Sequence, residues 1–357
     1  MKRFLCVVLS VVMLLGVCGS FSACSDDRIV LNVYNWGQYI ADGEDGALDV
    51  IAAFEEKYPH IRVNYSIYDS NEVMYTKLKT GGITVDVIFP SDYMIARMIS
   101  EGMLEKLNFD NIPNYQYIDD SYKNLAYDPN NEYSVPYTWG TVGIIYNTKY
   151  VDEADVTGWE LLWNKKYAGK ILMFDNSRDA FGIAQYLLGY DVNTTDKTEL
   201  QACADKLKEQ RPLVQQYVMD QVFASMENEE AWIAPYYAGD YLTMVEENED
   251  LAFYLPTGQG FNLFVDAICI PTCCKEKEAA ELFINFLCEP EICGQNLDYL
   301  GYSAPETAAK EYMDPEMANN PVAYPDEETL SRGTAFAFLP EEITRYVEEL
   351  FMDVRNH

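Results

Sequence analysis

Aromatic and carboxylate side chains recur together at five places in the sequence, each directly after an apolar run that is typical of a β-strand. The five segments are residues 35–39, 68–71, 90–93, 175–179 and 237–240. Ligands of an open parallel sheet bind outside the carboxyl ends of its strands, so we expect these side chains to converge on one cleft. Any one segment alone is more readily a helix cap or a packed loop, but the five together favour a binding site.

The chemistry of this set is that of a site for cations. Carboxylates accept charge-assisted hydrogen bonds from ammonium groups, and aromatic faces contact both methylene groups and cations. Almost no lysine or arginine accompanies them; Arg178 is the one nearby cation, and we expect it to orient a carboxylate or to cap a helix. A carboxylic or phosphoryl ligand would need basic groups, whereas an alkyl polyamine matches the residues present.

One further carboxylate stands out because its neighbours are apolar. Asp266 lies in the run Phe264-Val265-Asp266-Ala267-Ile268. Burying an unpaired charge is costly, so this side chain must have a partner. The sequence predicts that Asp266 holds an ammonium group where two lobes meet; the alternative is a structural partner, either a lysine or a backbone cap.

The elements that must position these residues alternate between short apolar runs and amphipathic stretches, a pattern typical of βαβ units and a largely parallel sheet. The expected strands are residues 29–34, 61–67, 85–89, 141–147, 170–174, 232–237 and 261–270. The expected helices are residues 48–58, 71–80, 179–189, 197–210 and 275–287, with another opening near residue 91. Residues 110–137 are rich in Asn, Pro, Tyr and Asp and are predicted to form loops.

Two α/β lobes with a ligand cleft between them are the expected architecture. About 330 residues follow the N-terminal leader described below, which is more than one hydrophobic core usually covers. Residues 137–140 are a candidate crossover between the lobes. We predict that residues 28–138 and 266–309 form lobe 1, and that residues 139–265 and 310–357 form lobe 2.

The first residues predict export. Lys2 and Arg3 precede an apolar run, residues 4–17, that leads into small residues, which is typical of a secretory signal peptide. That run is too short to span a bilayer comfortably, and no later segment has the roughly 20 consecutive apolar residues that a membrane helix needs. The chain is therefore expected to act outside the cytoplasm.

A lipid anchor is predicted at the end of this signal. The segment Phe-Ser-Ala-Cys at residues 21–24 resembles the bacterial lipobox, in which the cysteine is acylated and becomes the new N-terminus. We therefore predict a signal peptide over residues 1–23, acylation of Cys24 and a polar tether over residues 24–27. The alternatives are ordinary cleavage that leaves Cys24 unmodified, and an anchor at Cys18.

Charge and cysteine content narrow the class of protein. The formal charge is −33, and loss of Lys2 and Arg3 with the signal makes it −35. Nucleic acids and anionic membranes need a basic surface, so both are excluded as partners. Six cysteines remain after the anchor, in no zinc-binding spacing, and His60 and His357 are the only histidines. We expect no metal and no cofactor, and at most one or two disulfides, for which Cys288 with Cys293 is a candidate.

The chain resembles the spermidine/putrescine-binding proteins of bacterial ABC importers over nearly all of its mature length. The motifs that carry the resemblance are Tyr34-Asn35-Trp36 with Tyr39, residues 68–72 and 74–80, Pro90-Ser91-x-Tyr93, residues 134–140, Asp266 before Ile270-Pro271, residues 284–287 and Gly301-Tyr302. The resemblance implies a two-lobed periplasmic-binding-protein fold of type II, each lobe a mostly parallel sheet flanked by helices. It also implies polyamine capture, delivery to the transmembrane subunits of the permease, and a monomeric protein without catalytic activity.

The resemblance also implies a role for individual residues. The side chains expected to wall the cleft are Trp36, Tyr39, Tyr93, Tyr237, Phe264 and Tyr302. Ser91 would exchange a hydrogen bond with the ligand, and the carboxylates Asp179, Asp240 and Asp266 would hold its amines. Three positions depart from or vary within the family pattern: Tyr237 stands where Trp is common, Asn176 where Asp is frequent, and Asp179 where Glu is common. Asp240 matches the pattern of putrescine-preferring members, so the choice between spermidine and putrescine stays open.

Two other functions remain as alternatives. One is a binding protein of the same fold for an iron complex, a sugar or a vitamin. The other is an exported glycosidase in which Asp179 and Asp266 serve as acid and base on a sugar held by Trp36. The searchable catalytic motifs for serine hydrolases, zinc proteases and nucleotide-binding enzymes do not occur. A pair of catalytic carboxylates has no sequence signature of its own.

Overall fold

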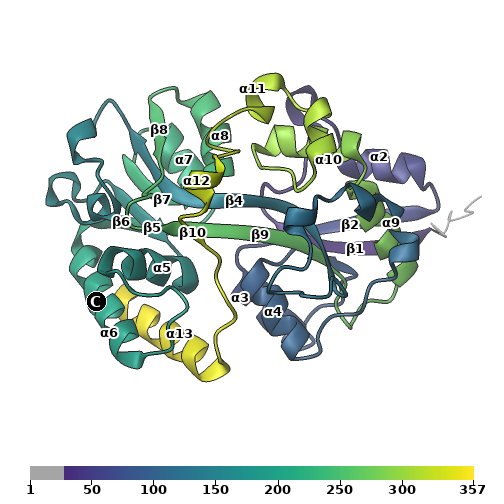
Figure 1. Ribbon diagram of the computed structural model, residues 1–357, viewed down its shortest axis with the longest axis horizontal. Helices are drawn as coiled ribbons and strands as arrows, with labels where there is room; N and C mark the ends of the chain where they lie inside the picture. Colours follow the sequence, from purple (N-terminus) through teal and green to yellow (C-terminus); the bar gives the residue numbers. More distant parts are fainter. Residues whose placement is uncertain (1–27) are drawn as a thin grey trace, which may run out of the picture.

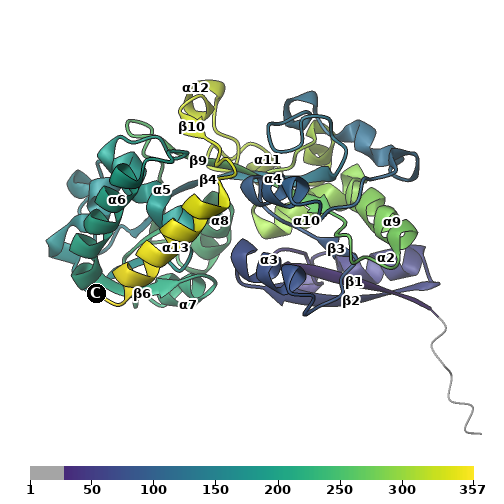
Figure 2. The ribbon, with the colours of Figure 1, turned by 90° about the horizontal axis from the view of Figure 1, so that it is seen from below.

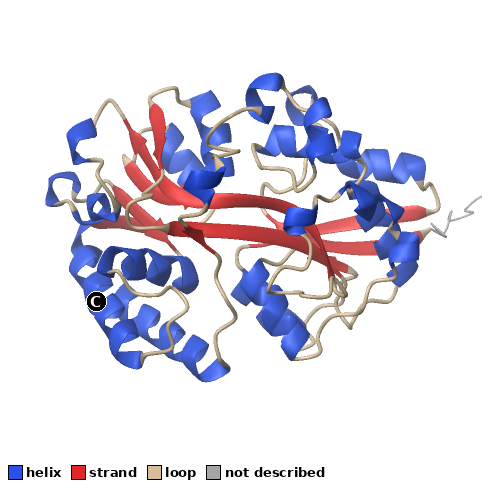
Figure 3. Ribbon diagram, viewed as in Figure 1, coloured by secondary structure: helices blue, strands red, loops and turns tan. Residues whose placement is uncertain are grey.

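A computed structural model of the protein describes residues 28–357. The predicted signal peptide, Cys24 and the tether lie outside the described residues. Two long neighbouring strands, β4 (Ser134–Asn147) and β9 (Phe261–Cys269), run through the middle of the elongated molecule and link its two halves. Figure 3 shows that helices surround these strands on both sides. Among the described residues, no helix is long and apolar enough to cross a membrane.

The strands form one path in the order β2-β1-β3-β9-β4-β7-β5-β6, with β10 beside β9 and β8 beside β4. The strands other than β4 and β9 are β1 (Ile29–Trp36), β2 (Ile61–Tyr68), β3 (Val87–Ile88), β5 (Ile171–Phe174), β6 (Val214–Val218), β7 (Ile233–Tyr237), β8 (Leu251–Tyr254) and β10 (Gly333–Thr334). Strands β1, β2 and β3 pair in parallel, and so do β5, β6 and β7. Strands β9 and β4 run antiparallel to each other and to β3, β7 and β8, whereas β10 pairs with β9 in parallel. The expected fold, mostly parallel sheets flanked by helices, is confirmed.

The half that contains β1 has helices on both faces of its sheet (Figure 1). They are α2 (Val50–Lys57), α9 (Lys277–Leu287) and α10 (Pro290–Leu300) on one face, and α3 (Asn71–Lys79) and α4 (Asp92–Ser100) on the other. Side chains that precede two of these helices fix where they begin: Asp49 accepts a hydrogen bond from the backbone N–H of Ala52, and Ser70 from that of Val73. These caps fix where the loops after β1 and β2 end and the helices begin.

The other half is built in the same way. Helices α5 (Ser177–Leu188), α6 (Lys197–Gln210) and α13 (Glu341–Arg355) lie on one face, and α7 (Gln221–Glu227) and α8 (Ala238–Glu247) on the other (Figures 1 and 2). Two short helices, α11 (Pro315–Ala318) and α12 (Glu327–Leu330), precede the chain's last crossing to α13. The expected lobe boundaries fall inside β4 and β9, and the division into lobes stays a prediction.

Two expectations about the chain differ from the structure. Residues 134–137, expected to be loop, are the first residues of β4, because the buried carboxylate of Asp128 accepts hydrogen bonds from three successive backbone N–H groups and the Ser134 hydroxyl. The candidate disulfide between Cys288 and Cys293 is absent, and all six described cysteines are free. Both residues of that pair are buried beside the carboxyl group of Glu306.

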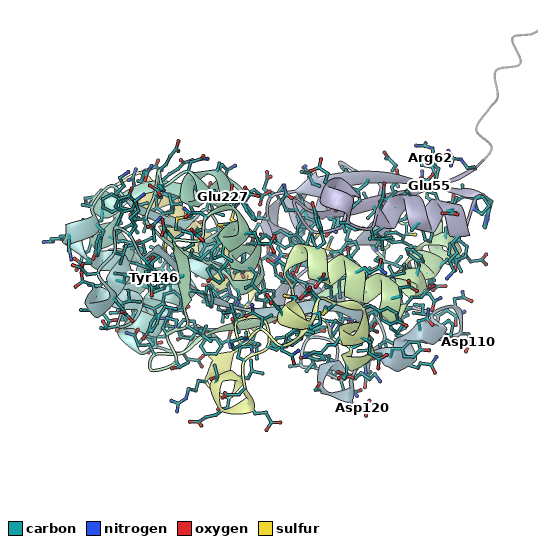
Figure 4. All side chains as sticks on the ribbon, turned by 90° about the horizontal axis from the view of Figure 1, so that it is seen from above. Glu55, Arg62, Asp110, Asp120, Tyr146 and Glu227 are labelled. Atoms are coloured by element: carbon teal, nitrogen blue, oxygen red, sulfur yellow. The ribbon has the colours of Figure 1, made fainter. Side chains whose placement is uncertain are left out.

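Charged side chains cover the exterior, as Figure 4 shows for Asp110, Asp120 and Glu227. Most ion pairs among the described residues have at least one well-exposed side chain; that of Lys106 with Glu132, for example, has both side chains more than 40% exposed. Such pairs contribute about 0–1 kcal/mol each. The acidic surface is therefore a solvated one, and the fold depends on its apolar core.

Strand β4 has a glycine where it faces the ring of Phe264. Gly140 pairs with Phe264 of β9, and a Cβ atom at position 140 would lie 2.8 Å from the ring of Phe264. Real Cβ atoms do not tolerate that separation, so the glycine gives the ring its place. Phe264 in turn has its edge against Tyr237, at a centroid distance of 5.5 Å.

We predict that Gly140→Ala destabilises the protein by about 1–3 kcal/mol, because the added methyl group overpacks the ring of Phe264. Urea unfolding followed by fluorescence measures the change. Gly258→Ala is the matched control, since a Cβ atom there meets nothing within 4 Å and its backbone is not left-handed. Equal stability of the two variants would contradict the role of Gly140.

Candidate binding site between the two halves

A cleft lies where the carboxyl ends of strands from both halves meet. All ten side chains expected at the site line it: Trp36, Tyr39, Ser91, Tyr93, Asp179, Tyr237, Asp240, Phe264, Asp266 and Tyr302. The remaining lining residues are Gly37, Gln38, Asn71, Asp92, Asn176, Met219, Asp220, Phe223, Tyr236, Asn262 and Phe336. The structure thus brings the expected residues together; that each of them contacts a ligand stays a prediction.

Each of the three expected aspartates accepts a hydrogen bond from a tyrosine hydroxyl. These bonds run from Tyr39 to Asp266 (2.7 Å), from Tyr237 to Asp179 (3.0 Å) and from Tyr302 to Asp240 (2.9 Å). In every pair the hydroxyl reaches only one of the two carboxylate oxygens. A neutral donor fixes the orientation of each carboxylate without neutralising its charge.

The aspartates of the cleft are buried, and this raises their pKa values. Burial raises the pKa of Asp179 and of Asp240 to about 7, and the pKa of Asp266 to about 6, while the tyrosine hydroxyls oppose the rise. The charge of Asp266 raises the pKa of the other two further. Within the described part of the chain, no lysine or arginine lines the cleft. The site therefore holds excess negative charge that a cationic ligand would relieve.

Asp266 has the most demanding environment of the three. It is 5% exposed, and its second oxygen, Oδ1, has no hydrogen-bond partner of acceptable geometry among the described residues. Its known partner is the Tyr39 hydroxyl, with the hydroxyl of Ser91 close enough to oppose the rise in pKa. Among the described residues, neither a lysine nor a backbone N–H binds this carboxylate, so the structural partners considered from the sequence are not found.

A polar network supports the site from the side of α3 and α4. The side-chain amide of Asn71 donates to the Ser91 hydroxyl at 3.0 Å and to the Tyr93 hydroxyl at 3.1 Å. The Tyr93 hydroxyl donates to Glu72 at 2.9 Å. The oxygen of Ser91 is thus an acceptor for Asn71, and its own proton can be donated to a ligand or to Asp266.

Aromatic rings form the walls and are held in fixed orientations. Tyr39 meets Tyr302 edge to face at 5.1 Å between centroids, and Tyr237 meets Phe264 in the same way at 5.5 Å. The indole N–H of Trp36 donates to the backbone carbonyl that follows β3, at 2.7 Å. These contacts leave rigid apolar surface beside the carboxylates.

Arg178 does not bind a carboxylate directly. Its guanidinium donates to the carbonyl of Val192 and to the side chain of Asn193, both at 2.8 Å, and lies 4.1 Å from the ring centroid of Phe336. It acts on Asp179 through charge alone, lowering the pKa of that carboxyl against the effect of burial. Its contacts hold the segment around Phe336, whereas we expected it to orient a carboxylate or to cap a helix.

Three lining residues of chemical interest were not predicted from the sequence, and a fourth, Asp92, lay in the predicted segment 90–93 without an assigned role. Asp92 is buried with its pKa raised to about 8, and Asp220 stands at the mouth, where burial and the charge of Asp69 raise its pKa. Asn262 and Phe336 complete the wall. Asp92 and Asn262 had a signal, since one adjoins Ser91 and the other precedes Asp266 by four residues on an alternating strand. Phe336 had none, because it enters the cleft from a distant part of the chain.

The described residues contain no group of three histidine, cysteine, aspartate or glutamate side chains placed to hold a metal ion. Three carboxylates of the cleft, those of Asp179, Asp240 and Asp266, each accept a hydrogen bond from a different tyrosine. This arrangement suits several separate cationic groups connected by an apolar chain better than one compact ion.

Comparison with known proteins places the chain among solute-binding proteins. Residues 49–325 match the family model described as bacterial extracellular solute-binding protein. The chain is 35% identical over 316 residues to the spermidine/putrescine-binding periplasmic protein of Escherichia coli (strain K12), an alignment that covers 88% of each chain. It is 30% identical to the putrescine-binding periplasmic protein SpuD of Pseudomonas aeruginosa, over 100% of this chain and 99% of the relative.

Solved structures agree with these relatives. The spermidine/putrescine ABC transporter substrate-binding protein PotD from Streptococcus pneumoniae aligns with a TM-score of 0.76 and 36% identity, over 92% of this chain and 99% of that one. The TpPotD lipoprotein of Treponema pallidum aligns with a TM-score of 0.80 and 30% identity, over 92% of this chain and 100% of that one.

We predict that Asp266→Asn changes how the stability of the ligand-free protein depends on pH. Folding raises the pKa of this carboxyl from 3.8 to about 6, so the folded state binds the proton more tightly than the unfolded chain does. This contribution to wild-type stability is present below about pH 4 and is lost as pH rises through about 6. Because asparagine does not titrate, the variant does not lose this stability. Its free energy of unfolding should exceed that of wild type by up to about 3 kcal/mol near pH 7.5, with little difference near pH 4.

Urea unfolding of both proteins at the two pH values measures this difference. If the variant is less stable than wild type near pH 7.5, the Asp266 carboxylate stabilises the ligand-free protein and is not an unpaired charge available to a cation.

Proposed function

The chain belongs to the bacterial extracellular solute-binding protein family, and from that premise we propose that it captures a polyamine, spermidine or putrescine, outside the cell. It would then deliver the polyamine to the transmembrane subunits of an ABC importer. The observation that carries the proposal is the set of three Tyr–Asp pairs in an aromatic cleft that no lysine or arginine among the described residues lines. The relatives whose names state polyamine binding share this family and most of this chain's length.

The physical match lies in charge and shape together. A polyamine carries ammonium groups at intervals along a flexible hydrocarbon chain, and each ammonium is a donor without acceptor capacity. The second oxygen of each paired aspartate is an acceptor for such a group, and the rings of Trp36, Tyr39 and Phe264 offer surface to the methylenes and to the cations. Binding would return the aspartates to their charged form and lower their raised pKa values.

Sugars and carboxylic solutes fit the same cleft less well. A neutral sugar leaves the excess negative charge of the three aspartates uncompensated, and an anion adds to it. Calorimetry against spermidine, putrescine, agmatine and a neutral sugar separates the alternatives that the sequence left open. We propose that the protein acts as a monomer, as the family resemblance implies.

We also propose that Cys24 carries a lipid that anchors the protein at the outer face of the cell membrane. The support is the lipobox-like segment at residues 21–24 and the polar residues after it. The similar TpPotD protein is described as a lipoprotein. Anchoring would keep the binding protein near its permease without any membrane-spanning helix.

We predict that purified protein binds spermidine or putrescine with a dissociation constant of roughly micromolar or better, about −8 kcal/mol, and turns neither over. Asp266→Asn should lose about 2–5 kcal/mol of that affinity, the usual range for removing one half of a buried charge pair. Titration calorimetry measures both quantities, and a rise in melting temperature with ligand supports them.

Asp128→Asn is the matched control, because Asp128 is equally buried but lies outside the cleft, where it binds backbone N–H groups. That variant should lose stability and keep its affinity. Absence of binding and of any melting shift with every polyamine would overturn the proposed function.

We predict that Cys24→Ser releases the protein from the membrane. Without a thiol at this position, no thioether to a diacylglycerol can form, so the protein should move from the membrane fraction to the soluble one. Fractionation with labelled fatty acid measures the change, and Cys18→Ser is the control. If the Cys24 variant stays in the membrane and still takes up label, the anchor lies elsewhere.

A further inference from the structure

Strand β9 presents alternate residues to two different spaces. Asn262, Phe264 and Asp266 line the cleft, whereas Leu263 and Val265 line an apolar cavity on the opposite side of the strand. Successive side chains of a strand point to opposite faces, so the three cleft residues form one row. Asn262 therefore extends the ligand-facing row beyond the aromatic ring and the carboxylate already assigned to the site.

The amide of Asn262 is buried without its full set of hydrogen bonds. The residue is 5% exposed, and its oxygen Oδ1 has no partner among the described residues. A buried acceptor that makes no hydrogen bond destabilises the protein that carries it. The amide can turn between two orientations about its last torsion, so its oxygen can face a donor that enters the cleft.

The distance between Asn262 and Asp266 along the strand suits a longer amine better than a short one. Residues rise by about 3.3 Å along a strand, so the backbone positions of Asn262 and Asp266 are about 13 Å apart. An extended amine advances by about 1.25 Å per bond, given bond lengths near 1.5 Å. The five bonds between the nitrogens of putrescine then cover about 6 Å, and the nine bonds between the terminal nitrogens of spermidine about 11 Å.

We propose that Asn262 is a ligand-contacting residue whose amide accepts a hydrogen bond from one nitrogen of a triamine while Asp266 holds another, so that it favours spermidine over putrescine. This inference rests on the proposed function, because it needs a polyamine in the cleft. With two hydrogen bonds of about 2.8 Å added, a fully extended diamine spans about 12 Å and falls short of both positions, whereas spermidine spans about 17 Å and reaches them without full extension. The amide thus adds affinity for the longer ligand without adding charge to a cleft that five aspartates already line.

Titration calorimetry of wild type and Asn262→Leu with spermidine and with putrescine tests the inference. Leucine keeps the size of the side chain and removes its acceptor. The variant should bind spermidine at least about tenfold more weakly and putrescine within about twofold of wild type, since a hydrogen bond to a charged donor is worth that much. Its melting temperature without ligand should hold or rise, because the unpaired amide is gone. Asn262→Asp, which restores an acceptor, should recover the preference for spermidine.

Thr141→Val is the control for a buried polar group outside the cleft. Thr141 is 1% exposed and pairs with Leu263, and its hydroxyl oxygen also lacks a partner among the described residues. That variant should leave both affinities unchanged. Equal loss of both ligands in Asn262→Leu, or no loss of either, overturns the role of Asn262 while wild-type binding still upholds the proposed function. If wild type itself binds neither spermidine nor putrescine, the proposed function is wrong.

Discussion

Negative charge held in a buried cleft without a matching cation is the constraint on which the site depends. Five aspartates line the cleft, and burial raises the pKa of each, which makes its ionised form unfavourable. The tyrosine hydroxyls orient three of the carboxylates but carry no positive charge, and Arg178 is engaged with backbone and amide groups elsewhere. The ligand-free protein is therefore strained electrostatically at the place where a cation would bind, and the energy stored there becomes available to binding.

The fold tolerates this strain because rigid elements hold the charged groups. Asp266 stands in the middle of β9, which is paired with β4 through both halves of the molecule. Asp179 lies in the first turn of α5 and Asp240 in the first turn of α8, where the helix dipole favours a carboxylate. The bond from Tyr302 to Asp240 joins a segment after α10 to α8, so on the predicted division it links the two lobes across the cleft.

Much of this arrangement was predictable, because the signals were local. Strand alternation identified β9 and the anomaly of Asp266, and the residues that follow apolar runs identified the rim of the cleft. The features that the sequence did not predict correctly are those that depend on tertiary packing. Phe336 enters the cleft only because the chain crosses the molecule once more before α13, and Arg178 serves that crossing segment through a ring contact with no sequence pattern. The start of β4 depends on the buried side chain of Asp128, which nothing nearby in the sequence announces.

The coupling among the aspartates explains why connected cations suit this cleft better than separate ones. The charge of Asp266 raises the pKa of both Asp179 and Asp240, so an ammonium placed at Asp266 makes ionisation of the other two easier. A monoamine gains only the first of these effects and leaves the remaining charge unpaired. In a polyamine the second ammonium is already tethered near the site that the first has prepared, and its local concentration is far above that of free amine in solution. The acidic exterior adds attraction at long range, but at physiological salt it is screened within about 8 Å, so selection among amines is made inside the cleft.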